Sequence, residues 1–69
     1  MIEVFKTNVV KKSQAKTLLK ILGERFNDFK MNFDLADCDK ILRVQGRTIS
    51  LEEIIELVKA NGYQCEVLV

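Results

Sequence analysis

Cys38 and the acidic residues around it form the group in this chain with the clearest capacity for metal chemistry. Asp37 and Asp39 are its direct neighbours, and Asp34 lies shortly before them. Thiolate and carboxylate groups can both bind Zn²⁺. Cys38, Asp37 and Asp39, assisted by Asp34, are therefore candidates for a weak metal site. The alternative, which we favour, is an ordinary turn, so we expect no metal and no cofactor.

Four lysines form a second distinctive group: Lys11, Lys12, Lys16 and Lys20. The last three recur at every fourth position, so on a helix they form one basic line. Acidic residues gather in a later segment, at Glu52, Glu53 and Glu56. These charges could be solvated, or could form salt bridges between neighbouring helices, each worth under about 1 kcal/mol. They could also dock an acidic protein surface. Lys11 and Lys12 could instead hold a small anion near free helix N–H groups.

Residue types that commonly perform catalysis are scarce. The chain contains no His, a single Tyr at position 63 and no glycine-rich phosphate loop. Ser13 has no base partner among its sequence neighbours, and a domain of 69 residues has little depth for a cleft. We therefore predict that the protein is not an enzyme.

Composition and charge limit the classes of protein to which the chain can belong. Its 69 residues suffice for one domain, 1–69, and 48% of them are apolar, which argues against disorder. Eleven basic and ten acidic residues give a net charge of +1, which indicates neither a nucleic-acid nor a membrane partner. Two cysteines are too few for a disulfide-rich secreted scaffold. We find no secretory signal, and no apolar run approaches the roughly 20 residues that span a bilayer. A cytoplasmic location is expected.

Apolar periodicity in the first half of the chain predicts a strand, a helix and a second strand. Ile2–Val10 is rich in β-branched and aromatic residues, with Phe5 and Val9 on one face. A helix from Lys12 to about Phe26 would carry an apolar stripe: Ala15, Leu18, Leu19, Leu22 and Phe26. Lys30–Ala36 alternates as a half-buried strand does, with three apolar residues on one face: Met31, Phe33 and Leu35.

The second half predicts a strand, a helix and a last strand after a turn at Asp37-Cys38-Asp39. Ile41–Gln45 is the returning strand, with Leu42 and Val44 facing inward. Ser50 is a good N-cap for the next helix, and Glu53 completes a capping box, with Ile49 and Ile54 as a hydrophobic staple. Asn61-Gly62 ends that helix. The last strand is Gln64–Val69, with three residues on one face: Cys65, Val67 and Val69.

This order of elements predicts an α+β fold of the ferredoxin-like type, βαββαβ. Two helices on one face of a four-stranded antiparallel sheet bury the apolar stripes economically. Right-handed crossovers then give the strand order 4-1-3-2. The second and fourth strands are opposite edges in this order, about 14 Å apart. A disulfide between Cys38 and Cys65 is therefore not expected, and we interpret Cys65 as a small core residue.

Four stretches carry a likeness to a known family: Phe5-Lys6-Thr7-Asn8-Val9, Leu18-Leu19-Lys20-Ile21-Leu22, Ile54-Ile55-Glu56-Leu57-Val58 and Asn61-Gly62-Tyr63. Through them, nearly the whole chain resembles the heavy-metal-associated domains of copper chaperones and metal-exporting ATPases. The Cys-x-x-Cys metal motif of that family is absent, because Lys11-Lys12-Ser13-Gln14 stands in its place. Lys11 and Gln14 fall on the two cysteine positions, and Val9 falls where the family usually has Met.

The resemblance implies a domain that has lost its metal site. Cu(I) binding in that family needs thiolates, whereas a charged lysine has no lone pair to give and repels a cation at the positive helix N-terminus. Chaperones of the family meet acidic partner domains through basic residues on their helices. The resemblance thus implies an acidic protein surface as the partner of the lysine line.

Our first hypothesis is therefore a protein-interaction module that binds through the lysines of its first helix. A second is a residual copper or zinc carrier that uses Cys38 and its acidic neighbours. A third is a ligand-sensing regulatory domain of the amino-acid-binding ACT type, which shares the topology and usually works as a dimer, so a homodimer is left open. RNA recognition on this fold needs exposed aromatics on the central strands, and Ile41–Gln45 has none.

Overall fold

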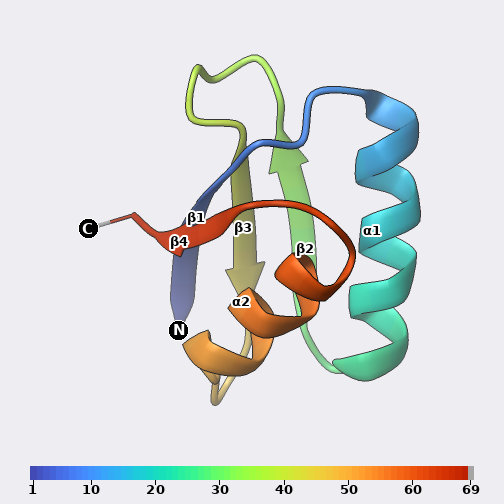
Figure 1. Ribbon diagram of the computed structural model, residues 1–69. Helices are drawn as coiled ribbons and strands as arrows, with labels where there is room; N and C mark the ends of the chain where they lie inside the picture. Colours follow the sequence, from blue (N-terminus) through green and yellow to red (C-terminus); the bar gives the residue numbers. More distant parts are fainter. Residues whose placement is uncertain (69) are drawn as a thin grey trace.

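Six elements follow one another along the chain in the computed structural model, which describes residues 1–68 (Figure 1). They are β1 (Ile2–Thr7), α1 (Lys12–Arg25), β2 (Lys30–Asp34), β3 (Ile41–Gln45), α2 (Leu51–Ala60) and β4 (Cys65–Val67). The strands pair antiparallel in the order β2-β3-β1-β4, and both helices lie on one face of the sheet. This is the ferredoxin-like βαββαβ fold. The same order counted from the β4 edge is 4-1-3-2, so the predicted strand order is confirmed.

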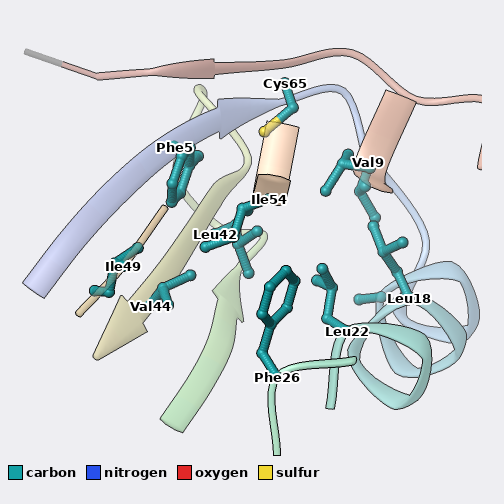
Figure 2. Packing of buried hydrophobic residues seen from close by; sticks show 12 residues of the cluster. Phe5, Val9, Leu18, Leu22, Phe26, Leu42, Val44, Ile49, Ile54 and Cys65 are labelled. Atoms are coloured by element: carbon teal, nitrogen blue, oxygen red, sulfur yellow. The ribbon is translucent and has the colours of Figure 1, made fainter. Parts of the chain in front are cut away.

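The core fills the space between the sheet and the two helices (Figure 2). The register aligns one apolar row across all four strands, comprising Phe33, Leu42, Phe5 and Val67. Leu18 and Leu22 of α1 and Ile54 and Val58 of α2 are buried against this face. Each such side chain, once fully buried, contributes about 1.5–3 kcal/mol to stability. Four residues of the stripe predicted for the first helix are buried, namely Ala15, Leu18, Leu22 and Phe26, and Leu19 is half-buried.

β1 is shorter than predicted, since it ends at Thr7 instead of Val10. The hydroxyl group of Thr7 donates to the Lys40 carbonyl and accepts the Val9 N–H at 3.2 Å, so it draws the chain out of the sheet. Val9 is nevertheless completely buried, as expected from the face that it shares with Phe5, whereas Val10 is 64% exposed.

β2 and β4 are also shorter than predicted, since β2 ends early and β4 begins one residue late. β2 ends at Asp34, not Ala36, because the chain already turns at Leu35, whose carbonyl accepts the Lys40 ammonium group at 3.0 Å. At the start of β4, Gln64 donates its N–H to the Asn8 side chain at 2.7 Å instead of pairing in the sheet. The prediction for Val69 concerns a position outside the described residues.

The helix ends agree with the sequence in most respects. At α2, the Ser50 hydroxyl accepts the Glu53 N–H at 3.4 Å, as predicted for an N-cap. The other half of the predicted capping box is not formed within residues 1–68, because the Glu53 carboxylate binds Arg25 instead, at 3.1 Å. Gly62 closes the C-terminus of α2 with a φ of +92°, as predicted, whereas α1 ends at Arg25, one residue early.

Candidate functional site

The loop between β1 and α1 is held by the side chain of Gln14. Its Oε1 accepts the backbone N–H of Lys11 at 3.1 Å and that of Val10 at 3.4 Å. Lys11 precedes the helix in an extended conformation and is exposed. A lysine ammonium group is a donor only, and the Gln14 oxygen already accepts two N–H groups. The two residues at the family's cysteine positions therefore do not fit a soft metal ion.

The turn after β2 brings three of the predicted metal candidates together. One ligand atom each of Asp37, Cys38 and Asp39 lies within 4.8 Å of the others. Asp34, the fourth candidate, does not belong to this group among the described residues, because it still lies in the strand. Both carboxylates already have partners: Asp37 Oδ1 accepts the Asp39 N–H at 2.8 Å, and Asp39 Oδ1 is 3.8 Å from the Lys6 ammonium nitrogen. These contacts are those of an ordinary Asx-type turn.

The two thiols are free and differ in their surroundings. Cys38 is exposed on the turn that follows the edge strand β2, whereas Cys65 is buried in β4 at the opposite edge of the sheet. Burial raises the pKa of the Cys65 thiol to about 11, with Lys59 opposing and Glu66 reinforcing the shift. A thiol with so high a pKa is a poor nucleophile, so Cys65 is a core residue, as predicted.

The four predicted lysines are exposed and extend from the N-cap of α1 to beyond its middle: Lys11, Lys12, Lys16 and Lys20. Within residues 1–68, none of them forms a salt bridge. A salt bridge does join the two helices, but it connects Arg25 to Glu53 and leaves the lysines out. The basic line thus has no acidic partner in the part of the chain that the structure describes.

A groove that was not recognised in the sequence runs between α1 and the edge strand β2. It has a volume of about 550 Å³. Its α1 wall consists of Lys12, Ala15, Lys16 and Leu19, and its other wall is formed by residues 32–36. The apolar side chains at its floor, Leu19, Phe33 and Leu35, are only half-buried. Alternation in the sequence marked Phe33 and Leu35 as inward-facing, and the predicted strand order made β2 an edge strand, but the sequence did not show that both side chains would stay partly open beside α1.

Comparisons of the chain with protein-family models, with curated proteins and with solved structures found no match. The fold is therefore described at the level of the ferredoxin-like arrangement, and the likeness to heavy-metal-associated domains is a hypothesis that rests on the sequence. Among residues 1–68, neither helix has the length and apolar character needed to cross a membrane.

Proposed function

We propose that this protein is a small, non-enzymatic interaction module, similar to heavy-metal-associated domains but without their metal site, that binds an acidic protein surface through α1. One observation carries the proposal: three exposed lysines on α1 and a fourth at its N-cap have no acidic partner within residues 1–68. The seven other basic residues are outnumbered by the ten acidic residues, so the chain apart from these four lysines is net negative. The positive field is therefore local to one face and suits one partner.

Such a surface acts mainly on the rate and selectivity of association. A basic patch that meets an acidic patch steers the encounter and excludes partners of like charge. The attraction is screened over about 8 Å at physiological ionic strength, so binding should weaken as salt is added. Free thiols at both cysteines suit a reducing compartment, and we propose the cytoplasm as the location.

The test compares the proteins captured from the native cell by three immobilised variants. The first is the wild type, and the second reverses the charge of the basic line in Lys12→Glu/Lys16→Glu/Lys20→Glu. The matched control reverses three exposed basic residues away from α1, in Arg43→Glu/Arg47→Glu/Lys59→Glu. We expect a set of proteins that is lost with the α1 reversal, retained by the control and released by added salt. Unchanged capture after the α1 reversal would remove the basis of the proposal.

The second candidate function is a residual copper or zinc site at the turn after β2. The proximity of the Asp37, Cys38 and Asp39 ligand atoms favours it. Titration with Cu(I) and with Zn²⁺ under reducing conditions tests it directly. Stoichiometric binding that Cys38→Ser abolishes would support this function and weaken the first proposal, whereas equal behaviour of wild type and variant would exclude Cys38 as a ligand.

A further inference from the structure

The outer edge of β2 presents backbone groups that no other strand within residues 1–68 pairs. Between β1 and β3, Met1 and Gly46 exchange two hydrogen bonds, of 2.8 and 3.0 Å, which fixes the alternation of the antiparallel ladder. Residues 42 and 44 of β3 then point their backbone groups to β1, and residues 41, 43 and 45 point theirs to β2. The partners of the latter are residues 34, 32 and 30. The N–H and C=O groups of Met31 and Phe33 therefore face outward.

This open edge is one wall of the groove between α1 and β2. Residues 32–36 line it on one side, and Leu19 and Ala15 line it on the other. Side chains alternate along a strand, so a strand added at this edge would direct every second side chain toward α1. Leu19, Phe33 and Leu35 offer those side chains a half-buried apolar floor. Main-chain pairing and alternate pockets are the two elements of recognition by strand addition.

Charge complementarity defines the chemistry of the occupant. Lys12, Lys16 and Asp34 are the charged residues that line the groove, so its lining is net positive, whereas Lys20, on the same helix, does not line it. We infer that the groove binds an extended acidic segment of a partner protein, which adds to β2 as a fifth strand. This inference rests on the proposed function. The apolar side chains of the segment lie against Leu19 and Phe33, and its carboxylates lie beside Lys12 and Lys16.

Two other occupants suit the groove less well. A helix would cover the outward N–H and C=O groups of Met31 and Phe33 without bonding them, and a buried unpaired polar group is costly. A second copy of this chain, paired edge to edge through β2, would place the lysines of both α1 helices on the same face of the joined sheet. Like charges brought together in this way oppose association.

The test uses a displayed library of short linear peptides selected on the wild-type protein at low salt. We expect the enriched peptides to alternate apolar residues and to carry Asp or Glu. An excess of a synthetic representative, at about tenfold its Kd, should slow hydrogen exchange of the Met31 and Phe33 amides by about tenfold. The amides of Leu42 and Val44, which point toward β1, serve as internal references.

Three variants separate the groove from the basic line as a whole. Lys16→Glu should weaken binding of the representative peptide by about tenfold or more, and Lys20→Glu by less than about threefold. Leu19→Glu, at a partly exposed position of the groove, should abolish binding. Each variant is first checked for the wild-type exchange pattern at Leu42 and Val44, which confirms that the sheet is intact.

The outcomes distinguish this inference from the function on which it rests. Equal losses for Lys16→Glu and Lys20→Glu, without protection at Met31 and Phe33, would overturn strand addition and leave the basic dock standing. If neither Lys16→Glu nor Lys20→Glu changes peptide binding, both strand addition and the proposed basic dock would be overturned. Enrichment of no peptide, or of peptides without acidic residues, would also overturn the inference. The inference would also be overturned if the protein self-associates in sedimentation and this self-association protects the Met31 and Phe33 amides, because the edge would then bind a second copy.

Discussion

At the scale of the residue, Cys65 couples the stability of the fold to pH. Its burial raises the pKa of its thiol from 9.0 to about 11. Below pH 9 the thiol is protonated in both folded and unfolded chains. As the pH rises from 9 to 11, the unfolded chain releases this proton while the folded chain retains it, so the free energy of unfolding falls. We expect a loss of up to about 3 kcal/mol from this group.

Other groups also titrate in this range, so the measurement is a difference between two proteins. Urea unfolding of the wild type and of Cys65→Ala at pH 8 to 11 gives the two pH profiles. The wild type should lose stability more steeply than the variant above about pH 9, the unperturbed thiol pKa. Parallel profiles would show that the thiol titrates equally in both states.

At Gly46, an added side chain would collide with the ring of Phe29. A Cβ at this position would overlap Cδ1 of Phe29, whose ring stacks on Phe26 with centroids 5.4 Å apart. Gly46→Ala must therefore displace the Phe29 ring, and we expect a loss of about 1–3 kcal/mol in thermal or urea unfolding. In a Phe29→Ala background the same substitution should cost less than about 1 kcal/mol. Equal costs in both backgrounds would place the strain elsewhere.

At the scale of the element, two glycines, one inside α1 and one just after α2, should respond to alanine in opposite directions. Gly62 has a φ of +92°, which L residues rarely adopt, so Gly62→Ala should destabilise the protein by about 1 kcal/mol. Gly23 lies inside α1, and an added methyl group there would meet no atom within 4 Å, so Gly23→Ala should stabilise the protein by about 0.5–1 kcal/mol. Thermal unfolding of the two variants checks both signs. A stable Gly62→Ala protein would mean that α2 can end without the left-handed residue.

Local sequence patterns predicted an element well where residues within that element alone determine its position and its ends. Apolar periodicity located both helices, and Ser50 and Gly62 marked the ends of α2. Strand ends were predicted less well, because contacts between distant segments set them. The chain leaves the sheet after Thr7, for example, because the Thr7 hydroxyl donates to the carbonyl of Lys40, a residue far along the chain. The missing half of the capping box has the same origin, since Glu53 binds Arg25 of the other helix.

At the scale of the whole molecule, the candidate site depends on how the elements assemble. The lysine line could be predicted because it repeats on a single helix. The groove could not, because it exists only where α1 passes an edge strand, and the residues that line it are far apart in the sequence. Phe33 and Leu35 would be core residues if another strand lay beyond β2. Strand order, and not hydrophobicity, leaves them available to a partner.

The lysine line should make the isolated molecule less stable than it could be. Like charges spaced four apart on a helix repel, and opposite charges attract, by about 0.2–0.5 kcal/mol per pair. Lys16 has such a neighbour on each side, at Lys12 and Lys20, and all three are exposed. Lys16→Glu converts two repulsive pairs into attractive ones. We therefore expect this variant to unfold at higher temperature than the wild type, with a gain of about 1 kcal/mol of stability at low salt.

Lys16→Gln provides the matched control, because it removes the repulsion without adding attraction and should fall between the two. The differences among the three proteins should shrink as salt screens the charges. A gain in stability together with a loss of binding would mean that Lys16 is kept for the partner at the expense of the fold, a common trade-off at functional sites. If Lys16→Glu instead destabilises the protein, the lysine has a structural role, and its effect on binding could no longer be read as electrostatic docking.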